Sequence, residues 1–297
     1  MSFDMFVQHF INAIGLGSLY GLIAIGYTMV YGILRLINFA HGEIFMLGAY
    51  FVYFATFIFQ IPWEISVAIA VVGATICGLT VERIAYRPLR QAPRISALIS
   101  AIGVSFFIQN LAVVLFSGMP RPVKQPEWLM KPLIINEIRV LPIAIIVPVV
   151  SLILVLGLLW IVYRTKPGLG MRAISRDIET TRLMGVSVNR IIALTFALGS
   201  ALAAAAGIMW ALRYPRVEPF MGFVPGLKAF IAAVFGGIGS IHGAMIGGII
   251  LGFVEIMSVA FFPKMSGYRD AFAFVILIAV LLIRPTGLLG EKLEDKI

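Results

Sequence analysis

The chain has 297 residues, of which 61% are hydrophobic and 12% charged, and its mean hydropathy is +1.02. Soluble domains carry about 25% charged residues, so this composition excludes a water-soluble particle and indicates an integral membrane protein. The net charge of +9 comes from basic residues between apolar runs, which is typical of positive-inside topology and not of nucleic-acid binding. The single cysteine, Cys77, excludes disulfides within the chain and cysteine metal clusters.

Long apolar runs follow one another along the chain, which favours membrane-spanning helices over the short alternating segments of a closed barrel. The apolar run at 226–262 is too long for one membrane crossing and is interrupted by the glycine-rich GGIGSIHGA. We therefore expect two shorter helices, at about 226–241 and 243–262. We expect an all-α polytopic bundle in a single domain, 1–297, with about eight to nine transmembrane helices, some of them broken or re-entrant. The other runs lie at about 10–34, 36–60, 64–85, 95–116, 141–163, 190–212 and 270–287.

The distribution of arginine predicts which loops share a side of the membrane. Four arginines cluster at 83–94 after the third run, and the segment 164–190 is the longest charged stretch of the chain. Both belong in the cytoplasm by the positive-inside rule. The loop at 117–140 mixes both signs with prolines and suits the outer side.

Polar residues in INFAHGE interrupt the second apolar run at Asn38, His41 and Glu43. Ionisable groups at membrane depth are costly and usually face a cavity or a partner, so a broken helix lining a translocation path is one interpretation. The other places the segment near the membrane surface, where His41 and Glu43 are solvated or cap a helix. Glu255 lies inside a later apolar run. We expect it to form a buried hydrogen bond to a neighbouring helix, and direct contact with a substrate is the alternative.

The glycine-rich break is the second candidate for the path, because unwound backbone at membrane depth is tolerated only where protein or a water-filled cavity satisfies it. Residues 30–50 weakly resemble 234–253, which suggests broken helices at corresponding positions of two repeats. We expect the break to lie near the INFAHGE residues of the other half. Its candidate residues are Gly236, Gly237, Gly239, Ser240, His242 and Gly243.

The charged segment 164–190 is the candidate for coupling to a cytoplasmic partner. Pro167, Gly168 and Gly170 are expected to break the preceding helix, and residues 171–184 to form a short amphipathic helix that Gly185 caps. A loop that lies on anionic headgroups of the membrane lipid is the alternative. An apolar face surrounded by charged residues could bind a cytoplasmic ATPase. The candidate residues are Arg172, Ile174, Arg176, Ile178, Glu179 and Arg182.

Signatures of enzymes are missing from the sequence. It contains no G-x-x-x-x-G-K-[ST] phosphate loop, no H-E-x-x-H and no G-x-S-x-G, and GGIGSIHG does not fit a dinucleotide fingerprint. One histidine and one glutamate two residues apart are not a complete metal-ligand set. We therefore expect no catalytic residues, no metal and no cofactor, and a chain that does not hydrolyse ATP itself.

Several stretches together resemble the permease subunits of ABC importers for branched-chain amino acids, the LivH-like branch. INFAHGE and the glycine-rich GGIGS–GA stretch are specific when found together, and the resemblance covers almost the whole chain. The matching stretches are 24–50, 82–90, 97–110, 168–210, 226–248 and 284–290.

The resemblance implies a heteromeric importer in a bacterial or archaeal cytoplasmic membrane. A second related permease, two cytoplasmic ATPase subunits and a periplasmic or lipid-tethered binding protein would be its partners. Glu179-Thr-Thr-x-x-x-Gly185 is loosely similar to the E-A-A-x-x-x-G loop of ABC permeases, with Thr180 and Thr181 in place of the alanines. Urea or short-amide importers use similar permeases and are the alternative, and a stand-alone channel is the alternative from another class.

Overall fold

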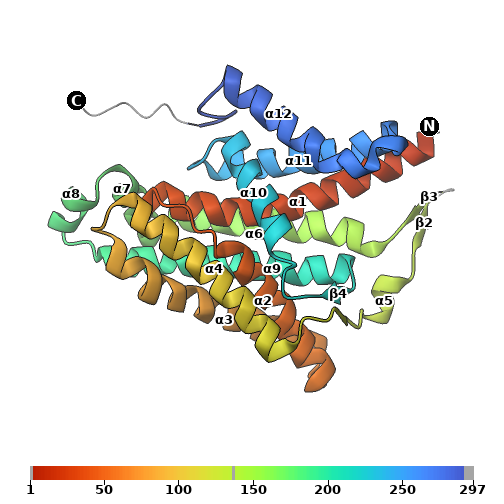
Figure 1. Ribbon diagram of the computed structural model, residues 1–297, viewed down its shortest axis with the longest axis horizontal. Helices are drawn as coiled ribbons and strands as arrows, with labels where there is room; N and C mark the ends of the chain where they lie inside the picture. The colour runs from red at the N-terminus through yellow and green to blue at the C-terminus, as the bar shows by residue number, and fades with distance from the viewer. Residues whose placement is uncertain (1–2, 136–137, 291–297) are drawn as a thin grey trace.

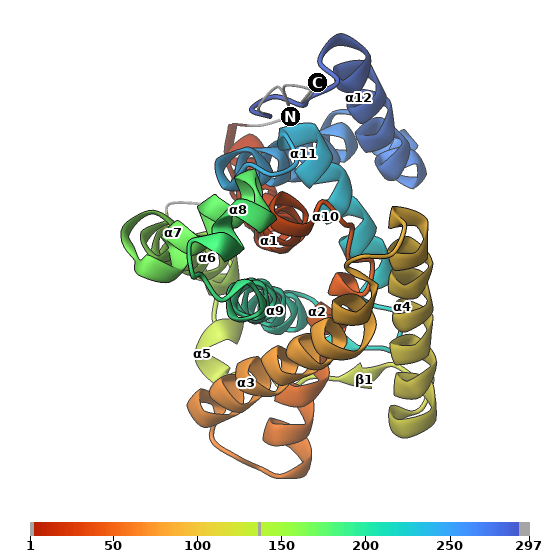
Figure 2. The same cartoon turned by 90° about the vertical axis from the view of Figure 1, so that its left-hand side faces the viewer.

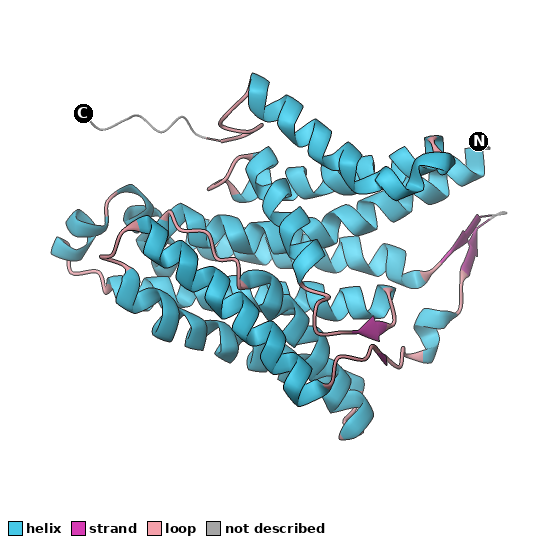
Figure 3. Ribbon diagram, viewed as in Figure 1, coloured by secondary structure: helices cyan, strands magenta, loops and turns pink. Residues whose placement is uncertain are grey.

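The computed structural model describes residues 3–135 and 138–290, and most of them are helical (Figure 3). The long helices are α1 (Phe3–Leu34), α3 (Trp63–Val81), α4 (Arg94–Phe116), α6 (Pro142–Arg164), α9 (Val188–Arg213), α11 (Ile241–Phe261) and α12 (Arg269–Ile283). Shorter ones are α2 (His41–Tyr53), α5 (Glu127–Met130), α7 (Lys166–Arg176), α8 (Ile178–Leu183) and α10 (Phe223–Gly236). Two small antiparallel strand pairs join β1 (Arg121–Pro122) to β4 (Arg216–Val217) and β2 (Leu133–Ile135) to β3 (Ile138–Val140).

Eight helical segments of the described chain are long and apolar enough to cross a membrane. Helix α10 is a ninth, shorter apolar helix, and it is separated from α11 by the glycine-rich turn. The expected all-α polytopic bundle and the split of the long run are thereby confirmed, although α10 begins at Phe223 and not at 226.

Helix α1 lies at the centre of the bundle, surrounded by α6, α9, α10 and α11 (Figure 2). Every residue of α1 from Gly15 to Val30 is buried, and most of them are apolar, which is the pattern of a helix surrounded by others. Its seam with α11 depends on small residues, as the four-residue spacing of glycines predicts. A Cβ atom added at Gly17 would lie 2.6 Å from the Ile249 Cα, so the two backbones are in contact.

Helix α2 begins inside the bundle and not at its end. The His41 imidazole lies against Gly26, which is eight residues before the end of α1, or about 12 Å along the axis. The chain reaches this depth from Leu34 through a non-helical elbow, residues 35–40. Helix α10 begins at the same depth, because Gly42 is packed against Gly222 and Gly226. The N-terminal ends of two half-depth helices therefore meet in the interior.

The loops gather at two opposite ends of the molecule (Figure 1). The Arg90 guanidinium donates a hydrogen bond to Asn189 Oδ1 at 2.6 Å, so the arginine cluster and the 164–190 segment share the α7–α8 end. The 117–140 loop lies at the other end, where the Gln125 amide donates to the Leu212 carbonyl at the end of α9. The predicted pairing of loops is confirmed. The tail, 291–297, lies outside the described residues.

Candidate functional site

The elbow 35–40 is fixed by a buried side-chain contact far away in the sequence. The Tyr86 hydroxyl donates to Asn38 Oδ1 at 2.9 Å, and both residues are buried. Arg35, at the start of the elbow, has a left-handed backbone with φ 52°, a conformation that costs energy for a residue other than glycine. The elbow is therefore a strained connection whose shape depends on Asn38.

His41 and Glu43, in the first turn of α2, are each 1% exposed and point to different neighbours. The His41 ring packs edge-on against Tyr27, with centroids 4.8 Å apart, and fills the notch left by Gly26. The Glu43 carboxylate accepts hydrogen bonds from Ser105 Oγ at 3.0 Å and Gln109 Nε2 at 2.7 Å, both on α4. Both residues are buried inside the helical bundle, so neither side chain is exposed to water.

The glycine-rich turn lies at the α7–α8 end. Gly237 and Gly239 have positive φ angles, 110° and 99°, which only glycine adopts without strain. Ser240 caps α11 by accepting a hydrogen bond from the Gly243 N–H at 3.1 Å. Gly236 and Gly243 pack backbone to backbone, and exposed His242 lies near Tyr163, with ring centroids 6.1 Å apart.

Residues 284–290 close the turn from outside. The N–H groups of Leu288 and Leu289 donate to the carbonyls of Phe235 and Gly236, each at 2.9 Å. The last carbonyls of a helix have no partner within it, so the segment completes the cap that Gly237 begins by donating its N–H to the Ala233 and Val234 carbonyls. Two stretches that the family resemblance singles out, GGIGS and RPTGLLG, are thus in contact.

The glycine-rich break was expected to lie near Asn38, His41 and Glu43, but the two sets of residues lie at different depths of the bundle. The glycine-rich turn lies beside Gly32, near the end of α1, whereas His41 lies deeper, beside Gly26. The half-depth helices instead meet through Gly42, Gly222 and Gly226. Sequence reasoning missed this junction, and the four-residue spacing of the two later glycines was the signal for it.

A cluster of charges joins α10, α11 and α12 to α1. Lys228 Nζ lies 3.0 Å from Glu255 Oε1 and 2.7 Å from Asp270 Oδ1. The Tyr20 hydroxyl donates to Glu255 Oε2 at 2.9 Å, and Arg269 Nε lies 3.0 Å from Glu255 Oε1. The expected buried hydrogen bond of Glu255 is confirmed, whereas Lys228 was missed because its partners come from other helices.

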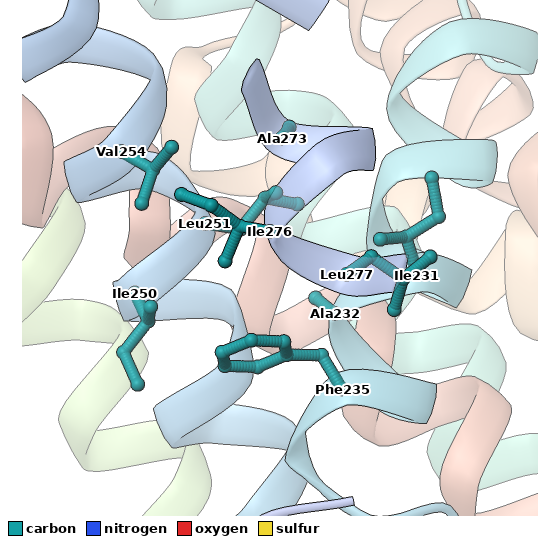
Figure 4. Close-up of a pocket in the computed structure, with 9 residues that line it drawn as sticks. All are labelled: Ile231, Ala232, Phe235, Ile250, Leu251, Val254, Ala273, Ile276 and Leu277. Atoms are coloured by element: carbon teal, nitrogen blue, oxygen red, sulfur yellow. The ribbon is translucent and has the colours of Figure 1, made fainter. Parts of the chain in front are cut away.

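One helical turn from this cluster, α10, α11 and α12 line a very small apolar pocket with a cavity volume of about 10 Å³ (Figure 4). Its lining is wholly hydrophobic and includes Phe235, Leu251 and Leu277. No polar side chain enters it, so the pocket offers nothing that could select a polar solute.

The charged segment forms two helices and not the expected single helix. Asp177 ends α7 and caps α8, accepting hydrogen bonds from the N–H groups of Glu179 and Thr180 at 2.9 and 3.2 Å. Gly185 has φ 79°, in the position expected for a glycine that ends a helix. The expected break of the preceding helix is present just before Pro167: α6 ends at Arg164, Thr165 is extended, and Pro167 lies in the first turn of α7. Gly168 and Gly170 do not break a helix, because they lie inside α7.

The apolar face expected for docking points into this chain. Ile174 is 1% exposed and belongs to the main hydrophobic core, and Ile178 is half-buried against that core. The most exposed apolar side chains of the segment are instead Leu183, the last residue of α8, and Met184, which follows it; they are 87% and 79% exposed, and Leu169 of α7 is 61% exposed. Among the predicted residues, Arg172, Arg176, Glu179 and Arg182 are exposed.

The family of branched-chain amino acid transport system permease components has a model that matches residues 9–281 of this chain. The chain belongs to this family. It is 42% identical to the high-affinity branched-chain amino acid transport system permease protein LivH of Escherichia coli K12, with 99% of each chain covered. It is 40% identical to the corresponding protein BraD of Pseudomonas aeruginosa, with 98% of each covered.

Among solved structures, PsaBC from Streptococcus pneumoniae in complex with a Fab matches with a TM-score of 0.50. The match has 16% sequence identity and covers 94% of this chain and 91% of the other. At this identity it supports the permease fold and says nothing about cargo.

Proposed function

We propose that this permease is one membrane subunit of an ATP-driven importer for branched-chain amino acids, located in the cytoplasmic membrane. The observation that carries the proposal is the similarity to LivH and BraD over nearly the full length of each protein. The absence of a phosphate loop from the sequence means that ATP hydrolysis belongs to partner subunits. Two ATPases, a second permease and a substrate-binding protein complete the proposed assembly.

The proposed path runs past the junction of α2 and α10. Half-depth helices with unwound connections are tolerated in a membrane only where protein or a cavity satisfies their backbone groups. Asn38, His41 and Glu43 hold one side of this region, and the turn at 236–243 closes its α7–α8 end. Asn38 Oδ1 and Glu43 Oε1 accept hydrogen bonds within the chain, whereas His41 Nε2 and Glu43 Oε2 are buried without a hydrogen-bond partner among the described residues. The path therefore offers the cargo few strong polar contacts. Selection of the amino acid then belongs to the binding protein.

The proposed ATPase-docking surface is the α7–α8 end, centred on Leu183 and Met184. Large apolar side chains exposed beyond the membrane-spanning helices indicate a partner that covers them. Thr180 and Arg182 are exposed beside them and can supply polar contacts at the rim.

Copurification tests the docking surface. The double change Leu183→Asp and Met184→Asp should abolish recovery of the ATPase subunits, because a buried, unpaired carboxylate costs several kcal/mol. The control is Met119→Asp, which changes a side chain of 75% exposure at the opposite end and should leave assembly intact. Undiminished ATPase recovery with the double variant would contradict the assignment.

Uptake tests the cargo. The complete complex in vesicles should take up leucine, and excess isoleucine or valine should compete while urea and acetamide do not. If urea or acetamide competes and isoleucine and valine do not, the cargo is a short amide and the proposed cargo is wrong.

A further inference from the structure

A continuous series of side-chain contacts runs from the α8–α9 junction into the membrane. Asn189, in the first turn of α9, accepts a hydrogen bond from Arg90 Nη1 at 2.6 Å. Arg90 Nη2 pairs with Glu82 Oε1. Four residues further along the same helical segment, the Tyr86 hydroxyl donates to Asn38 Oδ1 in the elbow. Five residues from three separate segments therefore join the surface proposed for docking to the start of the path.

The middle of the series lies on a π-helical turn, Glu82–Tyr86, which continues α3. Such turns are rare and are found mostly at functional sites, because the extra residue changes the direction in which side chains point. Here Glu82 faces Arg90 at the molecular end, and Tyr86 faces the elbow. One rigid turn thus holds both contacts, so a displacement of Arg90 reaches Asn38 without passing through a flexible loop.

The contact between Arg90 and Asn189 is exposed, and the contacts further along the route are shielded from solvent. Asn38, Glu82 and Tyr86 are buried, and the Arg90 side chain is 16% exposed. A buried ion pair resists rupture, because separating it leaves an uncompensated charge away from water. The elbow is the part of this route that can change conformation, because residues 35–40 are non-helical and Arg35 is held at φ 52°.

We propose that Arg90, Glu82 and Tyr86 are positioning residues that couple movement of the α8–α9 junction to the shape of the elbow and so to opening of the path. This inference rests on the proposed function, since it requires an ATPase that moves the α7–α8 end. It assigns the polar residues of the elbow a mechanical role, distinct from contact with the cargo.

Two variants break the series at its two ends. Tyr86→Phe removes only the hydroxyl that bonds to Asn38, and Asn189→Ala removes the exposed acceptor for Arg90. Tyr50→Phe is the matched control, because Tyr50 is equally buried on α2 and its hydroxyl has no hydrogen-bond partner among the residues that the structure describes. Each variant is placed in the complete reconstituted complex, in which leucine uptake and ATP hydrolysis are measured together.

The expected result is a fall in leucine transported per ATP hydrolysed, by about fivefold to tenfold for Tyr86→Phe, the range set by loss of one buried hydrogen bond, and by a smaller factor for Asn189→Ala, whose bond to Arg90 is exposed. Tyr50→Phe should leave the ratio unchanged. A cysteine at Leu36 in a Cys77→Ala background reports on the elbow directly. Its rate of thiol labelling should change on addition of ATP in the parent complex, and this response should disappear in both variants.

The outcomes separate the two claims. An unchanged transport ratio and a retained ATP response at position 36 in both variants would overturn the inference while leaving the importer intact. Loss of ATPase recovery together with transport would also overturn it, because the residues would then act in assembly. If the parent complex itself fails to take up leucine, the proposed function fails independently of the variants.

Discussion

At the scale of single residues, polar groups inside the bundle act as ties between helices. Glu43 is the clearest case, since α4 is otherwise a peripheral helix and Ser105 and Gln109 of that helix both donate to one carboxylate oxygen. In a membrane interior such bonds hold a helix where the hydrophobic effect gives no preference between lipid and protein.

Glu43→Ala should therefore lower the stability of the detergent-solubilised permease by about 1–3 kcal/mol, because two buried donors lose their acceptor. The loss of stability is measured by thermal unfolding, with the reaction of the Cys77 thiol as the probe, since this half-buried thiol on α3 becomes accessible on unfolding. Glu64→Ala is the control, because Glu64 is exposed on α3 and its removal should have no effect. Equal unfolding temperatures for the two variants would show that the ties to Ser105 and Gln109 contribute nothing.

At the scale of elements, glycine seams set how closely the central helices approach. Gly252 of α11 packs against Gly17 of α1, and a Cβ atom at position 252 would overlap the Gly17 backbone. Gly157 of α6 has open space where its Cβ would be.

Gly252→Ala should destabilise the permease by about 1–3 kcal/mol through overpacking. Gly157→Ala should be neutral or stabilising, by up to about 1 kcal/mol, because alanine favours the helix. The same thermal assay compares them, and a Gly252→Ala protein as stable as Gly157→Ala would contradict the close seam.

The spanning helices could be predicted from sequence because each needs a long apolar run, a signal that local composition carries. The interior start of α2 could not, since the elbow is held by Tyr86, which is 48 residues from Asn38. The break of the charged segment was also missed, although Asp177 followed by Thr180 is a recognisable helix start. Ile174 was assigned to a partner because its burial depends on tertiary packing alone.

At the scale of the whole molecule, the two ends differ in chemistry. The α7–α8 end holds the arginine-rich segments, and the opposite end holds the mixed-charge loop and the strand pairs. From the positive-inside rule we expect the α7–α8 end to face the cytoplasm.

Cysteines introduced at Lys166 and Lys124, both exposed and at opposite ends, test this orientation in a Cys77→Ala background. A membrane-impermeant thiol reagent applied to cells with a permeable outer barrier should label position 124 and spare position 166. Labelling at 166 before the inner membrane is opened would invert the orientation.

The central claim is that this permease moves its cargo only when driven by partner ATPases. Vesicles carrying the permease alone, and vesicles carrying the complete complex with its binding protein, are loaded with ATP and given radiolabelled leucine outside. The account predicts accumulation above the external concentration in the second set and no leucine entry above that of empty vesicles in the first. Equilibration of leucine by the permease alone would contradict it and identify a stand-alone channel.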